Sequence, residues 1–351
     1  MIHYKQHIIF YNQDARSALR ALETLPENAS RTLFVLNADN KLVGVITDGD
    51  IRRGLLDGRE ISDPAARFMN TQFKYLKESK YSVDEIKKFK QSDIYLIPIV
   101  DDTFELIDVV DLKNIRSLLP LTALIMAGGR GERLRPLTDV APKPMLKVGA
   151  KPIIEHNIDR LIKFGVSEIF ISVNYLKEQL IEYFGDGSKK GISIKYIEED
   201  KPLGTLGSLS LIETVAHDDI LVMNSDLLTN IDFEAFFLFY KEHRAQMAVA
   251  SIPYTVNVPY AVLKTNDHHI ESFVEKPSYT YYSNGGIYLF DFELRKLIRS
   301  NTFYNATDLM NKLIADDVKN LVHYPLLCYW LDIGKYEDYR KAQEDINYIS
   351  L

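Results

Sequence analysis

Near the middle of the chain, a glycine-rich turn follows a short apolar run and is surrounded by basic side chains. Gly128, Gly129 and Gly131 permit positive φ angles and a close approach of the backbone to a ligand. Backbone N–H groups in such a turn, from Ala127 onward, face a bound anion. Six cations outnumber the acids of this stretch: Arg130, Arg133, Arg135, Lys143, Lys147 and Lys151. Because guanidinium groups pair well with phosphate oxygens, the stretch predicts a polyphosphate-binding loop.

Two common nucleotide-binding loops do not fit this sequence. A P-loop needs the pattern G-x-x-x-x-G-K-[ST], which is absent. A dinucleotide-binding loop that starts at Gly129 would need glycine or alanine where Leu134 stands. Prolines stiffen the stretch, which favours a positioned loop over a basic surface turn: Pro136, Pro142, Pro144 and Pro152.

Two aspartates are the candidate metal ligands. Triphosphate chemistry normally needs a divalent cation, and Mg²⁺ takes oxygen ligands from one or two carboxylates. Asp226 follows the apolar run ILVMN, so we expect it at the carboxyl end of a strand. Asp332 stands in the stretch YWLDIGKYEDY. For Asp226 the competing role is that of a helix N-cap or a turn residue.

The stretch GGRGERLRPLT, followed by PKPM and KPIIEH, resembles the signature of the sugar-1-phosphate nucleotidylyltransferases. In that family the loop wraps the triphosphate. The resemblance implies that Arg133 and Lys143 neutralise charge on the phosphates and on the departing pyrophosphate. It also matches Asp226 and Asp332 to the two metal-binding aspartates of the family, the second from a W-x-D-x-G pattern, with Mg²⁺ as the implied cofactor.

The resemblance also implies residues for the sugar phosphate. The family's E-K-P motif matches Glu275 and Lys276, which would hold the sugar and its phosphate, with Lys276 as a third catalytic cation. Its N-x-G-I-Y strand matches Asn284, expected on the sugar hydroxyls, and Gly285, which leaves room for the ring. A surface ion pair and a β-bulge are the competing roles of these two motifs.

A third motif of the family, E-x-x-P-L-G-T, covers residues 199 to 205. The resemblance implies that the backbone at Gly204 lies against the nucleotide base and that Thr205 also binds the nucleotide. It implies that Glu199 or Asp200 contacts hydroxyl groups or ring nitrogens. Asn174, at a strand end, is a further candidate on the base side. Thr205 is equally suited to cap a following helix, and an asparagine at a strand end often forms a turn.

Size and composition limit the class of protein. A chain of 351 residues exceeds a usual single domain, so two domains are expected. No apolar run approaches the roughly 20 residues of a membrane span, and the N-terminus lacks the features of an export signal, so we expect a cytoplasmic protein. A net charge of −7 argues against broad binding to nucleic acid or anionic membranes. The single Cys328 cannot form an internal disulfide.

The first 120 residues carry a doubled pattern of strand, turn, strand and helix. One copy lies in RTLFVLNADNKLVGVITDGDIRRGLLDG and a degenerate copy in SDIYLIPIVDDTFELIDVVDLKNI. The pair resembles a tandem CBS module, which implies a regulatory site for an adenine nucleotide held by Thr47 and Asp50. The second copy has Asp108 where a hydroxyl residue is expected. The alternative is a structural or homo-oligomerising module in which Thr47 and Asp50 are a plain helix N-cap pair.

From residue 121 onward strands and helices alternate. We expect strands at 123–127, 168–173, 192–197 and 219–223, and helices near 153–164, 176–184 and 205–215. Shorter strands are expected around 246–252, 260–264, 270–275 and 285–290, before a final helix from about 335. The alternation predicts an α/β fold with a Rossmann-like, mostly parallel sheet of the nucleotidylyltransferase type. This catalytic domain is expected over 121–351, after a smaller α+β tandem CBS domain over 1–120. Its ligands should bind beyond the carboxyl ends of the strands.

The implied reaction is transfer of a nucleotidyl group from a nucleoside triphosphate to a sugar 1-phosphate, with release of pyrophosphate. A short core with a CBS pair most resembles guanylyltransferases of bacterial surface-sugar pathways, including glucosamine-1-phosphate guanylyltransferases that feed legionaminic acid synthesis. GTP and glucosamine 1-phosphate are therefore the favoured substrates. No residue physically demands guanine, so a uridylyl- or thymidylyltransferase stays open, as do an inactive nucleotide-sensing regulator and a structural oligomerisation protein.

Overall fold

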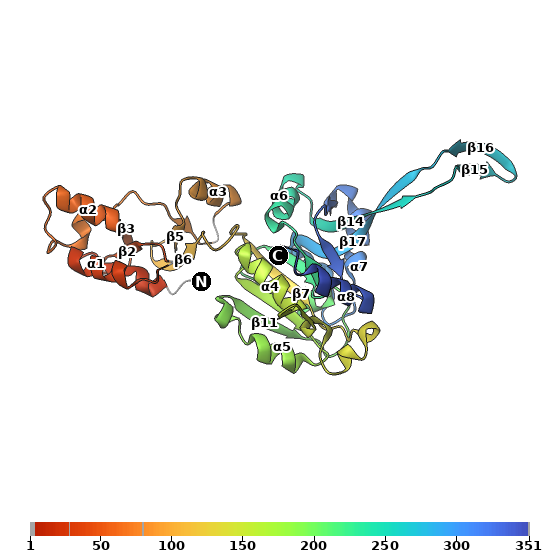
Figure 1. Ribbon diagram of the computed structural model, residues 1–351, viewed down its shortest axis with the longest axis horizontal. Helices are drawn as coiled ribbons and strands as arrows, with labels where there is room; N and C mark the ends of the chain where they lie inside the picture. The colour runs from red at the N-terminus through yellow and green to blue at the C-terminus, as the bar shows by residue number, and fades with distance from the viewer. Residues whose placement is uncertain (1–3, 28, 79–80, 350–351) are drawn as a thin grey trace. The chain divides into compact units, whose positions relative to one another are not determined.

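The computed structural model describes residues 4–27, 29–78 and 81–349. The chain divides into two compact units. The first comprises the chain up to Pro120 together with Lys163–Gly165 and Lys190–Ile192, and the second comprises the remainder from Leu121. Figure 1 follows the chain through both units by colour.

The first unit contains two three-stranded sheets with the same topology. In each sheet the first strand pairs with the second in parallel and the second pairs with the third antiparallel. The strands are β1 (Ile8–Phe10), β2 (Thr32–Leu36) and β3 (Leu42–Thr47), then β4 (Leu76–Lys77), β5 (Leu96–Val100) and β6 (Leu106–Asp111). The helices are α1 (Ala15–Thr24), α2 (Asp48–Leu56) and α3 (Val83–Gln91). The doubled sequence pattern thus corresponds to two similar sheets.

The prediction of a helix at the end of the second copy of the repeated pattern, after β6, is wrong. Whereas α2 follows β3 directly, residues 112–120 after β6 form turns and irregular backbone. The carboxylate of Asp111 accepts hydrogen bonds from Lys113 N and Asn114 Nδ2, both at 2.9 Å. Such an aspartate turn competes with helix formation, and Pro120 ends the segment.

The second unit is built on a seven-stranded sheet of order β11-β10-β7-β12-β17-β14-β18. Every neighbouring pair is parallel except those that involve β17, which runs antiparallel to β12 and β14. The bounds are β7 (Leu121–Met126), β10 (Glu168–Val173), β11 (Ser193–Glu198), β12 (Asp219–Asn224), β14 (Met247–Asn257), β17 (Ser278–Asp291) and β18 (Leu321–Pro325). All six residues of β10 are buried, as expected for a strand inside a parallel sheet. The expected mixed α/β fold with a parallel-dominated sheet is confirmed.

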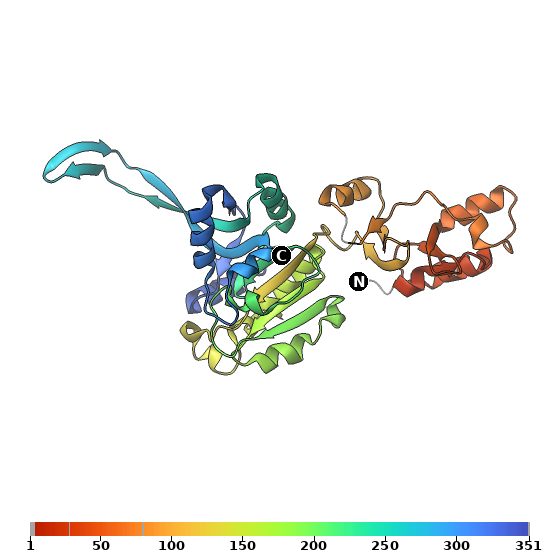
Figure 2. The ribbon, with the colours of Figure 1, turned by 180° about the vertical axis from the view of Figure 1, so that it is seen from behind.

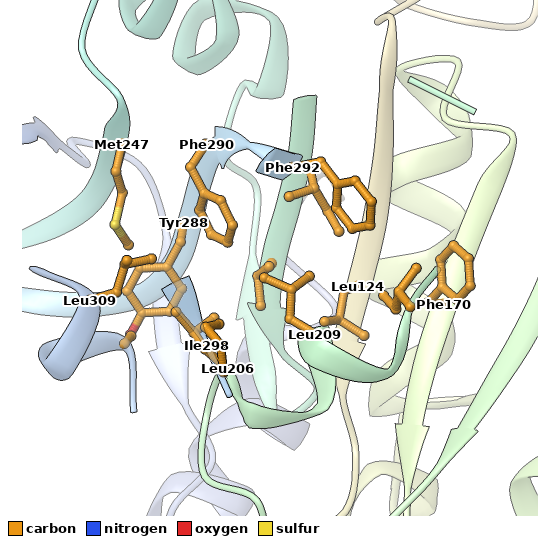
Figure 3. Close-up of a cluster of buried hydrophobic side chains, with 14 of the residues drawn as sticks. Leu124, Phe170, Leu206, Leu209, Met247, Tyr288, Phe290, Phe292, Ile298 and Leu309 are labelled. Carbon is orange, nitrogen blue, oxygen red and sulfur yellow. The ribbon is translucent and has the colours of Figure 1, made fainter. Parts of the chain in front are cut away.

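Helices and three short strand pairs complete this unit. The helices are α4 (Ile153–Lys163), α5 (Lys177–Phe184), α6 (Phe233–His243), α7 (Ala306–Asp316) and α8 (Tyr336–Asp345). The short pairs are β8 (Lys147–Val148) with β9 (Lys151–Pro152), β13 (Leu227–Thr229) with β19 (Trp330–Asp332), and β15 (Val262–Asn266) with β16 (His269–Val274). A buried cluster packs sheet residues such as Leu124 and Phe290 against the segments around Leu209 and Leu309, and Figure 3 labels these side chains. None of the helices described here combines the length and apolar character that crossing a membrane requires.

The prediction of an α-helix near residues 205–215 is also wrong. Only a 3-10 helix forms there, over Gly207–Leu211. The residues before it pair instead with a distant segment, because Leu206 N donates to Tyr304 O and Tyr304 N donates to Leu203 O, both at 2.9 Å. Gly204, at φ +76°, turns the chain into this pairing. Tertiary hydrogen bonds therefore replace the first turn of the expected helix.

A buried glutamate joins several segments of the sheet. The Glu168 carboxylate accepts hydrogen bonds from Thr122 Oγ1 (2.8 Å), Lys195 Nζ (2.8 Å) and Ala216 N (2.7 Å). Burial on its own raises the pKa of Glu168, but the hydrogen bonds from Lys195, Ala216 and Thr122 outweigh it and hold the pKa below its usual value. The resulting stabilisation is present above the unfolded-state pKa and is lost as the pH falls through the lowered folded-state pKa.

We expect Glu168→Gln to lower the free energy of unfolding of the second unit by about 1–3 kcal/mol at neutral pH, since it weakens hydrogen bonds to a buried charge. Chemical denaturation followed by the fluorescence of Trp330, the single tryptophan of the chain, reports on this unit. Glu182→Gln on the exposed surface of α5 is the matched control and should change stability by less than about 0.5 kcal/mol. Equal stability of the two variants would contradict this role of Glu168.

Candidate active site

The glycine-rich loop leaves the sheet at the carboxyl end of β7. Ala127 is buried and its N–H donates to Ser172 O at 2.9 Å, so it ends the strand. Gly131 has a φ of +64°, and a Cβ there would lie 2.9 Å from Lys143 Cβ. Only glycine combines that backbone conformation with that close approach. The loop is thereby held against the segment that carries Lys143.

The loop forms one wall of a cavity of about 790 Å³, a volume suited to a nucleotide. Many of the residues predicted from the sequence line it: Gly128, Gly129, Gly131, Arg133, Lys143, Asn174, Glu199, Gly204, Thr205 and Asp226. Ala127 is not among the lining residues. The structure therefore brings these predicted residues together around one cavity.

Neighbouring strands each contribute to the cavity just beyond their ends. Asn174 follows β10, Glu199 follows β11, and Asp226 lies two residues after β12. These strands are parallel to β7 and adjacent in the sheet, so their carboxyl ends meet at one edge. The cavity thus lies where ligands bind in open α/β sheets.

Hydrogen bonds fix the base-side wall of the cavity. Glu199 Oε2 accepts from Leu203 N at 3.0 Å, and Glu199 Oε1 accepts from Ser172 Oγ. Asn174 Nδ2 donates to the backbone oxygen of Glu199. The carboxylate of Glu199 is therefore engaged within the protein, where it positions the turn at residues 203–205.

Thr205 is also engaged. Its hydroxyl accepts a hydrogen bond of 2.7 Å from Ala306 N, at the start of α7, and does not cap the 3-10 helix that follows it in the chain. Phe303 and Asn305 line the cavity opposite and were missed from the sequence. The only local signal there is the capping pattern of Asn305 with Asp308, which marks a helix start and no binding site.

The two predicted metal ligands lie close together. Asp226 directly precedes β13, Asp332 ends β19, and in this antiparallel pair Leu227 is opposite Asp332. Ile333 N donates to Asp226 O at 3.1 Å, which fixes the relative position of the two segments. Lys143 Nζ forms an ion pair with Asp226 Oδ2, and both side chains are largely buried.

The remaining oxygens of this pair have no hydrogen-bond partner. Asp226 Oδ1 and Asp332 Oδ1 are buried, and no group of the described residues donates to either. Burial and the neighbouring Asp226 carboxylate raise the pKa of Asp332, although Lys143 and Arg133 act in the opposite direction. A carboxylate pair of this kind is electrostatically unfavourable without a further cation.

The pair fits a Mg²⁺ ion. Within the described residues no group of three or more His, Cys, Asp or Glu side chains forms a preassembled metal site. Mg²⁺ needs no such site, since it keeps water and phosphate oxygens and takes only one or two carboxylates. The large cavity is lined by a similar number of cations and carboxylates, the cations being Arg130, Arg133 and Lys143. Because these charges balance, a bound triphosphate needs additional positive charge.

Asp226 lines the large cavity, whereas Asp332 lines a second cavity of about 220 Å³. Its lining includes the predicted residues Asn284, Gly285 and Asp332, together with Asn224 and Trp330. Trp330 Nε1 donates to Gly285 O, and Asn284 Oδ1 accepts from Gly286 N, each at 2.9 Å. Asp226 and Asp332 therefore lie at the border between a nucleotide-sized cavity and a smaller one with hydrogen-bonding groups.

Comparison with known proteins identifies the family. The family model of nucleotidyl transferases matches residues 122–348, which is more than half of the chain. The chain belongs to the nucleotidyl transferase family. The CBS-domain model matches residues 7–57, so the amino-terminal unit contains a CBS domain.

Curated relatives include mannose-1-phosphate guanyltransferases. The Schizosaccharomyces pombe enzyme is 32% identical over 228 residues, and the catalytic subunit beta of the Dictyostelium discoideum enzyme is 33% identical over 227 residues. Each match covers 62% of this chain, and the chain spans 62% of the length of each relative. A solved Bacillus anthracis structure, described as a glucose-1-phosphate thymidylyltransferase, matches with 25% identity and a TM-score of 0.54 over 66% of this chain and 97% of that one.

Three of the loop cations do not line either cavity of this nucleotidyl transferase. Arg135 forms an ion pair with Asp139 at 3.2 Å, and Lys151 pairs with Asp159 at 2.5 Å. Lys147 is exposed on β8. Of the six predicted cations, those that line the large cavity are Arg130, Arg133 and Lys143.

Glu275 and Lys276 are not brought to the other site residues. Both are exposed, between β16 and β17, and neither lines the two cavities. They lie beyond the Asn257–Ser278 pair, at the far end of the β14–β17 ladder from Asn284. Their roles at the sugar phosphate remain predictions.

In the CBS unit, Thr47 and Asp50 form a capping box at the start of α2. Thr47 N donates to Asp50 Oδ2 at 2.8 Å, and Asp50 N donates to Thr47 Oγ1 at 3.3 Å. Asp50 also pairs with Arg53 at 2.6 Å. The structural role named as the alternative is thus present, and nucleotide binding by this pair stays a prediction.

Proposed function

We propose that this nucleotidyl transferase transfers a guanylyl group from GTP to a hexose 1-phosphate and releases pyrophosphate. The observation that carries the proposal is that Asp226 lines the large cavity and the adjacent Asp332 lines the small one. Each has a buried oxygen without a partner among the described residues. A triphosphate in the large cavity and a sugar phosphate in the small one would meet at these carboxylates. Guanine is supported by the mannose-1-phosphate guanyltransferases among the relatives.

The reaction needs no nucleophile from the protein. An oxygen of the sugar phosphate attacks the α-phosphorus, a new P–O bond forms, and the bond to the bridging oxygen of the β-phosphate breaks. Pyrophosphate leaves with that electron pair. Mg²⁺ held by Asp226 and Asp332 would supply positive charge at the phosphates, as hard cations do in phosphoryl-transfer sites.

The chain's own residues align and neutralise the reactants. Lys143 is held between the loop and Asp226, so its ammonium group can be shared between that carboxylate and a phosphate. Arg133 is exposed at the cavity wall beside Gly334 and is free to form a bidentate pair with phosphate oxygens. Alignment of two repelling anions and stabilisation of the departing charge are the main contributions expected of such a site.

For the acceptor we propose glucosamine 1-phosphate, because a nucleotidyl transferase domain joined to a CBS domain resembles the guanylyltransferases that supply legionaminic acid synthesis. The relatives' own acceptor, mannose 1-phosphate, is the competing substrate. An activity matrix decides both the nucleotide and the acceptor. It tests GTP, UTP, dTTP and ATP against the 1-phosphates of glucosamine, mannose and glucose, in the presence of Mg²⁺ and with pyrophosphate release as the readout. We expect GTP with glucosamine 1-phosphate to give the highest kcat/KM.

Each other outcome has a defined meaning. A maximum with dTTP or UTP would replace the guanylyl assignment, and a maximum with mannose 1-phosphate would replace the acceptor. If no pair of substrates released pyrophosphate but the full chain bound adenine nucleotides, the protein would be an inactive nucleotide-sensing regulator. That result would contradict the proposal.

A further inference from the structure

The two sides of the large cavity differ in charge. The basic side chains that line it, Arg130, Arg133 and Lys143, all lie on the loop after β7. The opposite wall consists of residues 199–205 and 303–305, and its described lining residues include carboxylates but no lysine or arginine. The phosphates of a nucleotide carry its negative charge, whereas its base is neutral. A nucleotide in this cavity therefore has its phosphates on the loop side and its base at the opposite wall.

Phe303 is the aromatic side chain of this opposite wall in the described structure. It is 62% exposed. Within the described residues, its ring stacks on no second ring and lies beside no cation. An exposed phenyl ring of this kind adds little to the hydrophobic core, so its face is available to a ligand.

Hydrogen bonds hold the backbone on both sides of Phe303. Before it, Asn301 N donates to Ser210 Oγ at 3.3 Å. After it, Tyr304 N donates to Leu203 O at 2.9 Å. The side chain of Tyr304 packs against the buried cluster that Figure 3 shows. Phe303 is therefore exposed on a fixed backbone, and a ligand that contacts its ring has little ordering of the chain to bring about.

The segment that carries Phe303 lies directly against Gly204. A Cβ at Gly204 would be 2.8 Å from Tyr304 O and 2.8 Å from Asn305 Oδ1. The family resemblance assigns the backbone at Gly204 to the nucleotide base. Phe303, one residue before Tyr304, is thus on the side of the cavity where the base is expected.

We infer that the ring of Phe303 stacks on the base of the bound nucleotide. The inference rests on the proposed function, in which the large cavity is the nucleotide site. Because every base has a π face, stacking adds affinity and does not select guanine through hydrogen bonds. One base stacked on an aromatic side chain corresponds to about 5- to 150-fold in affinity.

Isothermal titration calorimetry with GTP and Mg²⁺, in the absence of a sugar phosphate, tests the contact. Phe303→Ala is expected to weaken GTP binding by about 5- to 150-fold, and Phe303→Trp, which keeps an aromatic face, should stay within about threefold of wild type. Phe303→Leu keeps an apolar side chain without a π face and should lose affinity as the alanine variant does. Wild-type affinity of the leucine variant would overturn stacking, because apolar cover alone would then suffice.

Steady-state kinetics separate binding from chemistry. A base is bound equally in the ground state and in the transition state, so Phe303→Ala should raise the KM for GTP and change kcat by less than about threefold. The rise in KM should be similar to the loss of affinity for GTP. A fall in kcat with an unchanged KM would place Phe303 at the reacting groups and overturn the inference.

Phe273→Ala is the matched control. Phe273 is 66% exposed on β16 and lines neither cavity. It belongs to the β15–β16 hairpin, which Figures 1 and 2 show extending away from the sheet. This variant should bind GTP as the wild type does. Unchanged affinity of Phe303→Ala, or equal losses in both variants, overturns the inference.

The two proposals fail in different ways. A wild-type chain that binds GTP through Phe303 but releases no pyrophosphate with any sugar 1-phosphate would refute the proposed function and leave the stacking result intact. A wild-type chain that releases pyrophosphate from GTP, beside a Phe303→Ala variant with the same KM, would refute stacking alone. A wild-type chain that binds no nucleotide would refute both.

Discussion

Replacement of Asp226 by asparagine is expected to lower the rate of pyrophosphate release by about 10²- to 10³-fold, as for the loss of one group that stabilises transition-state charge. The physical reason is that Asp226 has one oxygen paired with Lys143 and one that is buried without a partner among the described residues. Asparagine removes the charge that both a cation and Lys143 need. Steady-state assays over a range of Mg²⁺ concentrations should show a lower maximal rate and a higher Mg²⁺ requirement.

Asp232→Asn is the matched control for this prediction. Asp232 caps α6 and accepts a hydrogen bond from Ala235 N at 2.9 Å, outside both cavities. Asparagine and aspartate are about equally good N-caps, so the control should keep its stability and its rate. A full rate for Asp226→Asn at low Mg²⁺, or equal losses in both variants, would show that Asp226 does not hold a cation.

Elements that depend on local sequence were predictable. The strand expected at 168–173 matches β10, and the helix expected at 153–164 matches α4 to within one residue. Ile154, Ile158 and Leu161 recur at helical spacing and are buried, so local pattern and tertiary packing agree there. By contrast, α6 was not expected, because FEAFFLFY is apolar almost throughout and carries little periodicity.

Elements decided by distant contacts were not predictable. The segment after Gly204 pairs with Tyr304, a partner that no pattern near residue 205 reveals. The sequence indicated a strand at 285–290, whereas β17 begins at Ser278 because its polar and aromatic outer half pairs with β14. For the same reason the separation of Lys276 from Asn284 could not be foreseen, since it follows from the length of that ladder.

The site residues also fall into two groups, those that local sequence predicts and those that only distant contacts bring together. The glycines and the cations of the loop are close in sequence, so residue types and spacing indicated a phosphate site directly. Asp226 and Asp332 come together only through the pairing of β13 with β19, and the family resemblance, not the spacing, pointed to their common role. Phe303 and Asn305 carry neither kind of signal and became apparent only from the cavity.

Replacement of Arg133 by alanine is expected to lower kcat by about 10²- to 10³-fold with little change in stability. Arg133 is exposed on the cavity wall, so its removal leaves no buried gap. Its guanidinium lies next to Gly334, where a Cβ would be 3.5 Å from Arg133 Nη2. Burial and Asp226 raise the pKa of the nearby Asp332, and the charge of Arg133 opposes part of that rise. Arg133→Lys should recover only part of the rate, because an ammonium group cannot form the bidentate pair with phosphate.

Arg135→Ala separates a specific role of Arg133 from the general charge of the loop. Arg135 is two residues away, equally cationic and exposed, but it pairs with Asp139 and lines neither cavity. If charge near the loop sufficed, both variants would lose activity together, and the loss would shrink in high salt. If the geometry of the cavity decides, kcat should fall for Arg133→Ala and stay within about threefold of wild type for Arg135→Ala, because only the first removes a group that can contact the departing pyrophosphate.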